Sequence, residues 1–221
     1  MNNNIVITGA NRGIGLSLSA LYQAKGWQVY GICRQSSDAL NALGVSVIEE
    51  VDLAEDADIE KIARLLDGIG IDILINNAGI LRDEVLGNIN YDSIQTQFII
   101  NTLAPLKVSE VLRPKFKTNG KLIMITSRMG SMHDNTSGGR YGYRMSKAAL
   151  NAASVSLAHD LRDQGVAVGI IHPGYVRTDM VNGYGDITAD ESAKRIEQRI
   201  SELNMQNSGS FWHSNGEVLP F

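Results

Sequence analysis

This chain of 221 residues has a single cysteine and no long apolar run. One cysteine, Cys33, cannot form an internal disulfide, which is typical of a protein from a reducing compartment. No apolar run approaches the roughly 20 residues that span a bilayer. The N-terminus enters an apolar segment, Ile5-Val6-Ile7, without the basic and then apolar residues of a signal peptide. We therefore expect a soluble, cytoplasmic protein with no membrane segment.

Positive charge is also scarce, with 20 Lys and Arg against 24 Asp and Glu and a net charge of −4. No basic stripe stands out, so the composition argues against a nucleic-acid partner. The four histidines show no metal-ligand spacing with cysteine or carboxylates, and no metal site is predicted. His172 closes an expected strand, and we interpret it as a packed core histidine rather than a catalytic base.

No repeat, low-complexity tract or linker divides the chain, so residues 1–221 are expected to form one domain. Short runs rich in Ile and Val alternate with amphipathic stretches, and Gly26, Gly44 and Gly165 stand where helices should end. This alternation predicts an α/β, doubly wound parallel sheet with helices on both faces, a single-domain Rossmann fold. The expected strands are 4–8, 28–33, 46–51, 71–75, 120–126 and 166–172, and the expected helices are 14–25, 37–43, 56–67, 91–112, 141–163 and about 189–203.

The turn after the first strand is rich in glycine. In such sheets a ligand binds beyond the carboxyl ends of the strands, where the strand order reverses. The segment there is Thr8-Gly9-Ala10-Asn11-Arg12-Gly13-Ile14-Gly15, in which Gly9 permits a sharp exit while Gly13 and Gly15 let the backbone approach a phosphate. The spacing differs from G-x-G-x-x-G, since Leu18 stands at the third glycine. A purely structural turn is the alternative.

Two arginines indicate which nicotinamide would bind. A site for NAD needs a carboxylate at the end of the second strand, but that strand ends at Arg34. Arg12 adds a cation in the glycine turn, so both guanidiniums could hold a 2′-phosphate, and NADP(H) is favoured over NAD(H). The alternatives are two solvated arginines, or Asp38 as the ribose carboxylate, although Asp38 lies beyond the strand end.

The next two strands end in residues suited to an adenosine. Asp52, followed by Leu53, could accept a hydrogen bond from the adenine amino group, or could be the N-cap of the next helix. Asn76-Asn77-Ala78-Gly79 follows the fourth strand, where small residues leave room and the amides can brace neighbouring strands. A structural turn is again the alternative there.

Tyr143 and Lys147 are four residues apart on an expected helix and so share a face. The ammonium should lower the pKa of the phenol, which could then exchange a proton with a carbonyl or an alcohol, while the lysine holds the nicotinamide ribose. Ser127, just after the fifth strand, could hold the substrate oxygen; Ser131 competes for this role but lies deeper in the loop.

A turn follows the sixth strand, where Pro173 and Gly174 force the chain to change direction. The backbone of Val176 and the hydroxyl of Thr178 could there bind the nicotinamide carboxamide. The segment after Met180, residues 181–188, is short for a substrate lid and predicts an open site.

Together these motifs resemble the short-chain dehydrogenase/reductase family, which carries T-G-x-x-x-G-x-G, N-N-A-G, a serine, Y-x-x-x-K and a P-G turn in this order. The resemblance implies catalytic roles for Ser127, Tyr143 and Lys147. It also implies one for Asn101, as support for a water chain that feeds protons to the lysine. The loop before Tyr143 and the C-terminal Gly209-Ser210-Phe211-Trp212 segment are similar to the C-factor-like carbonyl reductases. Unlike the usual pattern, 16 steps separate Ser127 from Tyr143, so the longer loop should reshape the pocket.

The leading hypothesis is therefore an NADPH-dependent oxidoreductase that reduces an aldehyde or ketone, with a small carbonyl or alcohol as its substrate. The alternative is an NADP(H)-binding signalling or regulatory protein with little or no turnover. Small residues on the outer face of the Tyr143 helix, together with the resemblance, favour a homodimer or homotetramer, although they could also pack within one chain. These residues are Ala148, Ala149, Ala152 and Ala153.

Overall fold

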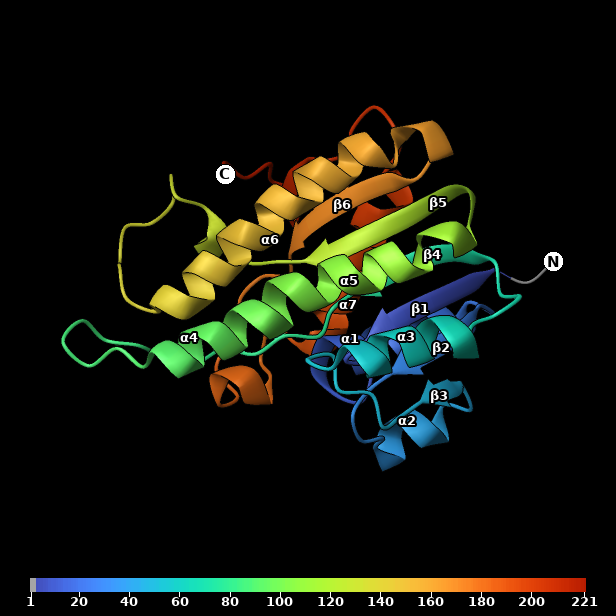
Figure 1. Ribbon diagram of the computed structural model, residues 1–221, viewed down its shortest axis with the longest axis horizontal. Coiled ribbons are helices and arrows are strands. Elements are labelled where there is room, and N and C mark those ends of the chain that lie inside the picture. The colour runs from blue at the N-terminus through green and yellow to red at the C-terminus, as the bar shows by residue number, and fades with distance from the viewer. Residues whose placement is uncertain (1–2) are drawn as a thin grey trace.

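The computed structural model describes residues 3–221, which form one parallel sheet covered by helices (Figure 1). The strand order is β3-β2-β1-β4-β5-β6-β7, and all six pairings are parallel. The order reverses between β1 and β4, which is where a doubly wound sheet opens a ligand crevice. The predicted fold class is confirmed. The strands are β1 (Asn4–Thr8), β2 (Gln28–Ile32), β3 (Ser46–Ile48), β4 (Ile71–Asn76), β5 (Phe116–Ile125), β6 (Ala167–His172) and β7 (Phe211–His213).

The helices begin and end close to the predicted positions, because caps in the sequence define them. Ser37, Asn90 and Thr188 each accept a hydrogen bond from a backbone amide three residues on. Gly26, Gly44 and Gly165 have φ values of +78°, +66° and +68°, as expected after a helix end. The helices are α1 (Gly13–Ala24), α2 (Asp38–Ala42), α3 (Asp56–Leu65), α4 (Tyr91–Phe98), α5 (Ala104–Leu112), α6 (Tyr141–Asp160) and α7 (Ala189–Glu202).

Alternate residues of each strand point to opposite faces and build two separate cores. Along β1, Ile5 and Ile7 pack against α1 and α7, whereas Val6 packs against α3, α5 and α6. α3, α5 and α6 cross the near face of the sheet in Figure 1. Because both faces are buried, the strands are apolar throughout rather than alternating, which is the pattern the sequence shows.

Four features differ from the predicted elements. β3 ends at Ile48 rather than at residue 51. β5 begins at Phe116 rather than at residue 120, through a polar stretch in which Asn119 has φ of +64°. β7 was not predicted, since three residues with two aromatic side chains carry too little periodicity. The predicted helix 91–112 is interrupted by a π-helical turn, Ile99–Leu103. No helix within residues 3–221 has the length and apolar character needed to cross a membrane.

Candidate active site

The glycine turn between β1 and α1 adopts a backbone that its glycines permit. Gly9 and Gly13 have φ of +66° and +53°, in the left-handed region. A Cβ on Gly15 would overlap the carbonyl oxygen of Gly9 and lie 2.7 Å from Nδ2 of Asn77. The amide of Gly9 donates to the carbonyl of Ile32 at 2.8 Å, which fixes the turn at the end of β2. The N-terminus of α1 therefore opens at the carboxyl edge of the sheet, an arrangement that binds pyrophosphate.

The Asn-Asn-Ala-Gly turn after β4 is bonded directly to the end of β1. Nδ2 of Asn77 donates to the carbonyls of Thr8 and Gly9 at 3.0 and 3.2 Å. The hydroxyl of Thr8 accepts from the amides of Asn77 and Ala78 at 3.0 and 3.1 Å. The two strands on either side of the crevice are thus held by one asparagine and one threonine.

The two arginines expected to select NADP lie at this edge with their guanidiniums exposed. Arg12 forms an ion pair of 3.7 Å with Asp179, and its side chain is 69% exposed. Arg34 forms one of 3.9 Å with Asp52, and its side chain is 70% exposed. Pairs this exposed contribute little to stability, so both guanidiniums can turn toward an anion.

Asp52 is not the N-cap of the next helix, which corrects one of the two roles considered for it. The N-cap residue of α3 is Glu55. Oδ1 of Asp52 instead accepts from the amide of Ala54 at 3.0 Å, so this carboxylate stabilises the turn that leads to α3. Leu53, beside it, is half-buried.

Two further residues of the glycine turn serve the local structure. Nδ2 of Asn11 donates to the carbonyl of Gln35 at 2.9 Å, and its own carbonyl accepts from the hydroxyl of Ser37 at 2.7 Å. Ile14 packs against the core beneath α1. Asn11 therefore joins the turn to the loop after β2, which carries Arg34.

α6 brings Tyr143 to the end of β5, where Ser127 lies. Tyr143 is 8% exposed and Ser127 is 7% exposed, and the two side chains lie close enough for the Ser127 hydroxyl to affect the pKa of the phenol. Ser131, the competing serine, accepts from the amide of Asp134 at 3.1 Å and so stabilises its own loop. Of the two serines, the structure brings Ser127 to the phenol.

Burial sets the protonation of the tyrosine and the lysine. It raises the pKa of Tyr143, an effect that the nearby Ser127 hydroxyl and the positive charge of Arg140 offset in part. The expectation that Lys147 would lower this pKa is wrong for this structure. Nζ of Lys147 lies 5.9 Å from the centre of the Tyr143 ring and donates to the carbonyl of Ile125 at 2.9 Å. Its own pKa is lowered to about 8 by burial. The phenol therefore keeps its proton at neutral pH.

Asn101 lies in the π-helical turn, and its side chain bonds both the backbone of Ile80 and Ser146 on α6. Its Oδ1 accepts from the amide of Ile80, and its Nδ2 donates to the Ile80 carbonyl, both at 2.8 Å. Nδ2 also donates to the hydroxyl of Ser146 on α6 at 3.0 Å. A Cβ on Gly79 would lie 3.1 Å from Oδ1 of Asn101 and 3.7 Å from Nζ of Lys147, so these groups adjoin the turn after β4.

The turn after β6 is anchored from two sides. The carbonyl of Pro173 accepts from the hydroxyls of Ser192 and Ser214 at 2.9 and 3.0 Å. Gly174 follows with φ of +96°, a conformation that favours glycine. The chain therefore leaves the sheet edge along a fixed path.

That path leads back to the glycine turn. A Cβ on Gly13 would lie 3.3 Å from Cγ2 of Thr178, so the segment after β6 lies against the glycine turn after β1. Val176 forms a parallel bridge with Ile187, which folds residues 181–188 into a tight loop. A cofactor placed on the glycine turn would thus pass the candidate residues Val176 and Thr178.

The longer loop before α6 is tied to the C-terminal tail. Arg128 pairs with Asp134 at 2.8 Å and with Glu217 at 2.9 Å. The amide of His133 donates to the carbonyl of Phe221 at 3.4 Å. The tail is therefore bonded to the loop that begins directly after Ser127.

His172 lies at the end of β6 and packs edge-on against His213, with ring centres 4.9 Å apart. Burial, and then the positive charges of His213 and Arg128, lower the pKa of His172 to about 3. The ring is neutral, as a packed histidine should be. Within residues 3–221 no group of three or more His, Cys, Asp or Glu side chains could hold a metal ion.

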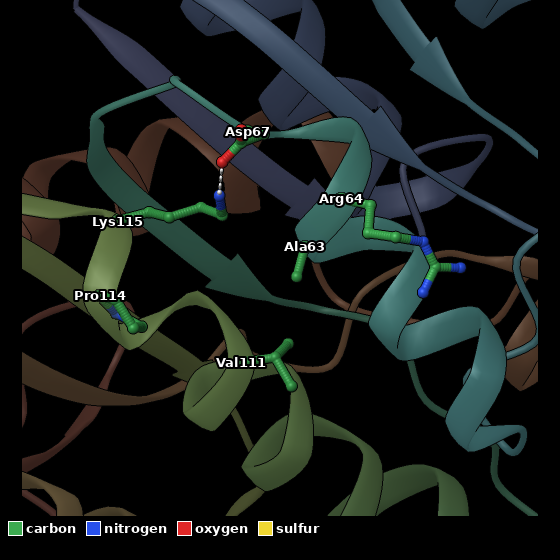
Figure 2. Close-up of a pocket in the computed structure, with 6 residues that line it drawn as sticks. All are labelled: Ala63, Arg64, Asp67, Val111, Pro114 and Lys115. Atoms are coloured by element: carbon green, nitrogen blue, oxygen red, sulfur yellow. Dashed lines mark hydrogen bonds and ion pairs between the residues drawn. The ribbon is translucent and has the colours of Figure 1, made fainter.

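A hollow of about 430 Å³ lies between α3 and α5, away from all of these residues (Figure 2). Two of its polar side chains, Asp67 and Lys115, are paired with each other at 3.2 Å. None of the candidate residues lines it. We therefore place the site at the carboxyl edge of the sheet, where the motifs meet, and not in this hollow.

Three residues near the site were missed by the sequence interpretation: Glu84, Gln97 and Gly142. Glu84 stands in a polar stretch that resembles a surface loop, so no local pattern marks it. Gln97 had a signal, because Ser93, Gln97 and Asn101 recur every fourth residue and so form a polar stripe on one helix face.

The order of motifs and their meeting at one sheet edge define a class of protein. A family model for short chain dehydrogenases matches residues 3–189. The chain belongs to the short-chain dehydrogenase/reductase family, and the predicted resemblance is confirmed.

Particular relatives cover most of the chain. A 1-hydroxy-2-glutathionyl-2-methyl-3-butene dehydrogenase of Rhodococcus sp. (strain AD45) is 37% identical over 97% of this chain and 98% of its own length. The C-signal protein of Myxococcus xanthus is 40% identical over 68% of this chain and 93% of its own length. An NADPH-bound carbonyl reductase from chicken fatty liver has a TM-score of 0.89 at 28% identity, covering 100% of this chain and 99% of that one. The similarity to C-factor-like proteins is thus confirmed.

The outer face of α6 is left uncovered by the rest of the described chain at Ala152, which is exposed, while Ala148, Ala149 and Ala153 are partly exposed. This leaves room for a neighbouring subunit. The homodimer or homotetramer stays a prediction.

Proposed function

We propose that this protein is an NADPH-dependent carbonyl reductase, which converts an aldehyde or ketone to an alcohol. One observation carries the proposal: a buried phenol, Tyr143, whose raised pKa keeps it protonated, lies beside Ser127 near the edge where the glycine turn opens. Reduction of a carbonyl requires a proton donor at the oxygen, and a phenol that keeps its proton at neutral pH meets this need.

The residues present fit a nicotinamide dinucleotide. The glycine turn and the N-terminus of α1 suit a pyrophosphate, while Arg12 and Arg34 offer exposed guanidiniums to a 2′-phosphate. When bound, the reduced cofactor supplies the hydride. Carbonyl reductases of similar structure, one crystallised with NADPH, support this assignment.

Each candidate catalytic residue has a separate task in this proposal. Ser127 holds the carbonyl oxygen of the substrate, and Tyr143 donates a proton to that oxygen as the carbon is reduced. Lys147, with a pKa of about 8, holds the nicotinamide ribose and replenishes the proton of the phenol. Asn101 supports the path of that proton through its position between the Ile80 backbone and α6.

A second candidate is an NADP(H)-binding signalling protein, which the similarity to the C-signal protein favours. In that case cofactor occupancy would matter and turnover would not. The two candidates differ in what removal of the Tyr143 hydroxyl should do.

The test follows NADPH consumption by absorbance, with wild type beside Tyr143→Phe. The panel contains activated aldehydes, diketones, quinones and an aldehyde with a thioether-linked glutathione, the last because one relative is named for a glutathionyl alcohol. We expect turnover by the wild type, loss of about 100-fold or more in the variant, and unchanged NADPH affinity. Full activity of Tyr143→Phe would remove this residue as the acid. If both proteins bound NADPH and neither turned over, the signalling function would be favoured.

A further inference from the structure

Residues 80–84, which follow the Asn-Asn-Ala-Gly turn, run between α4 and α6. Three polar side chains one helical turn apart reach every second residue of this segment. Asn101 bonds the backbone of Ile80, and Oε1 of Gln97 accepts from the amide of Arg82 at 3.0 Å. Ser93 donates to the carboxylate of Glu84 at 3.1 Å. The segment is therefore fixed along its length to α4 and the π-helical turn.

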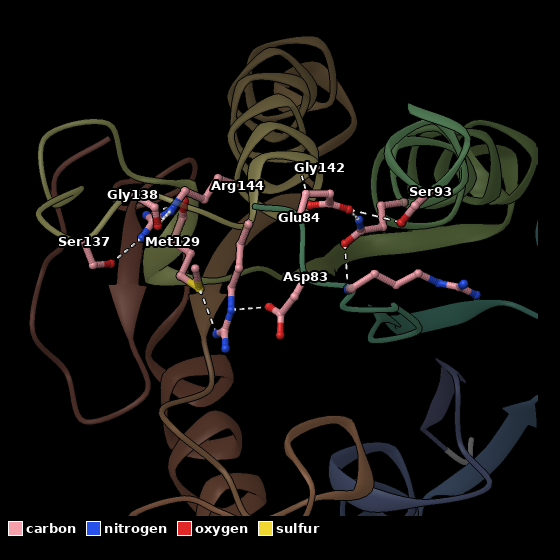
Figure 3. Close-up of polar contacts among 11 residues, drawn as sticks. Asp83, Glu84, Ser93, Met129, Ser137, Gly138, Gly142 and Arg144 are labelled. Carbon is pink, nitrogen blue, oxygen red and sulfur yellow. Dashed lines mark hydrogen bonds and ion pairs between the residues drawn. The ribbon is translucent and has the colours of Figure 1, made fainter. Parts of the chain in front are cut away.

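Glu84 carries this connection across to α6. Its side chain is 2% exposed, and Figure 3 shows it between Ser93 and Gly142. Oε1 accepts from Nε2 of Gln97 at 2.6 Å, and Oε2 accepts from the amide of Gly142 at 3.0 Å. The N-cap residue of α6, Arg140, makes no side-chain cap of its own. Glu84 thus caps the helix from a distant segment, where a negative charge is favourable.

The fit around Gly142 leaves no space for any other residue. A Cβ there would lie 2.6 Å from Nε2 of Gln97, 3.0 Å from Cγ1 of Ile94 and 3.1 Å from Oε1 of Glu84. The carboxylate of Glu84, the side-chain amide of Gln97 and the backbone of Gly142 are in close contact, so a change in one displaces the others.

Two contacts of this kind orient α6, and each involves the residue before a candidate catalytic residue. Glu84 holds Gly142, which precedes Tyr143. Asn101 holds Ser146, which precedes Lys147. Because Gly142 and Ser146 are four residues apart, they lie on one face, and together they fix the rotation of the helix about its axis.

We propose that Glu84, held by Gln97, is a positioning residue that sets the rotation of α6 and so places the Tyr143 phenol against Ser127. This inference rests on the proposed function for its catalytic consequence. Glu84 acts through the Gly142 amide, and its buried carboxylate is bonded to the protein groups of Ser93, Gln97 and Gly142.

The hydrogen-bond pattern predicts which substitutions should fail and which should restore the contact. In Glu84→Gln the side chain keeps only one oxygen, and the other position becomes an NH₂ group. This NH₂ must face either the backbone N–H of Gly142 or Nε2 of Gln97, so two hydrogen-bond donors meet without an acceptor. In Gln97→Glu two carboxylates meet. In the double variant the glutamine oxygen accepts from Gly142, its NH₂ donates to the new glutamate, and that glutamate still accepts from Arg82. The exchange therefore satisfies the Gly142, Arg82 and residue 97 contacts again, while the Ser93 hydroxyl, which donates to Glu84 in the wild type, would accept from the second NH₂ hydrogen.

The experiment compares wild type, the two single variants and the double variant as full-length protein with NADPH and the best substrate from the panel. We expect kcat to fall about ten- to hundredfold in each single variant, since small misplacements of reacting groups cost this much. KM for NADPH should change less than about twofold, because the glycine turn and both arginines are untouched and Asn101 still holds Ser146, which precedes Lys147. The double variant should recover most of kcat. Gln95→Glu, the same change at an exposed site of α4, should leave kcat unchanged.

A second readout needs no turnover. Exchange of the Gly142 amide with deuterium should speed up in Glu84→Gln, and the resonances of a ring-labelled Tyr143 should shift; both should return toward wild type in the double variant. Wild-type kcat and protection in Glu84→Gln, or a double variant no better than the product of the single effects, would overturn the proposal. If the wild type reduced nothing, the proposed function would fail, while exchange and resonances would still decide the positioning role. If a single variant folded poorly, the double variant would decide.

Discussion

Lys147 is a charged group in a site that disfavours charge, and this leads to a prediction that needs no substrate. The residue is 4% exposed, and its Nζ donates to the carbonyl of Ile125 at 2.9 Å. Burial lowers its pKa from 10.5 to about 8. The fold therefore binds this proton less tightly than the unfolded chain does.

The size and the sign of the effect follow from that difference. At about 1.4 kcal/mol per pH unit, the drop from 10.5 to about 8 corresponds to about 3 kcal/mol. Below pH 8 the lysine is charged in both states, and the whole cost is present. Between about pH 8 and pH 10.5 the folded lysine loses its proton first, so the contribution to the free energy of unfolding rises with pH.

Lys147→Met removes the charge and keeps an unbranched side chain of similar length. The gain of about 3 kcal/mol is offset by about 1–3 kcal/mol for the Ile125 carbonyl that loses its donor. At neutral pH the variant should therefore be as stable as the wild type, or up to about 2 kcal/mol more stable, although carbonyl reduction is lost.

Urea unfolding at neutral pH, pH 8 and pH 10.5 tests this, with Lys194→Met, at an exposed site of α7, as the control for alkaline effects on the rest of the chain. Across this range the stability of the wild type relative to Lys147→Met should rise by about 3 kcal/mol, so that the wild type becomes the more stable protein at pH 10.5, and Lys194→Met should show no such trend. A difference that does not change with pH would refute the argument. So would a loss of more than about 3 kcal/mol at neutral pH.

Three further predictions concern other parts of the molecule. Gly15→Ala should lower the free energy of unfolding by about 1–3 kcal/mol in urea and weaken NADPH binding, because the new methyl overlaps the Gly9 carbonyl. Arg34→Asp should cut the preference for NADPH over NADH about tenfold or more, measured as the ratio of kcat/KM values, and an unchanged ratio would contradict the NADP assignment. His172, whose pKa is lowered to about 3, should destabilise the fold as pH falls from 6.5 toward 3; His172→Phe should lose less stability over that range, and parallel curves would exclude this histidine as a source of acid lability.

Most of the fold could be predicted because strands buried on both faces are apolar throughout. β1, β2, β4 and β6 lie within one residue of their predicted bounds for this reason. β7 has three residues, and it is recognisable as a strand only through its pairing with β6. The π-helical turn at Ile99–Leu103 is equally hidden, because nothing in an apolar helical pattern marks one additional residue in a turn.

The site was predictable where function constrains a short local motif. The glycine turn and the Tyr143–Lys147 pair are examples of such motifs. It was not predictable where function depends on contacts across the fold: Glu84 meets Gly142 over 58 positions of sequence. The sign of the Tyr143 pKa change was also wrong, because spacing gives proximity to Lys147 but gives no measure of burial, which here outweighs the neighbouring charge.

The burial of Lys147 and the capping of α6 by Glu84 are connected through the same helix. A lysine that costs about 3 kcal/mol would be relieved by any movement of α6 that let water reach Nζ. Such movement is opposed at Gly142 by Glu84 and at Ser146 by Asn101, both of which are themselves buried and hydrogen-bonded. The contacts at Gly142 and Ser146 therefore keep α6 in a position in which the charge of Lys147 is buried at a cost in free energy. That arrangement explains why polar groups, which are costly to bury, are concentrated along one side of the helix that carries the candidate catalytic residues.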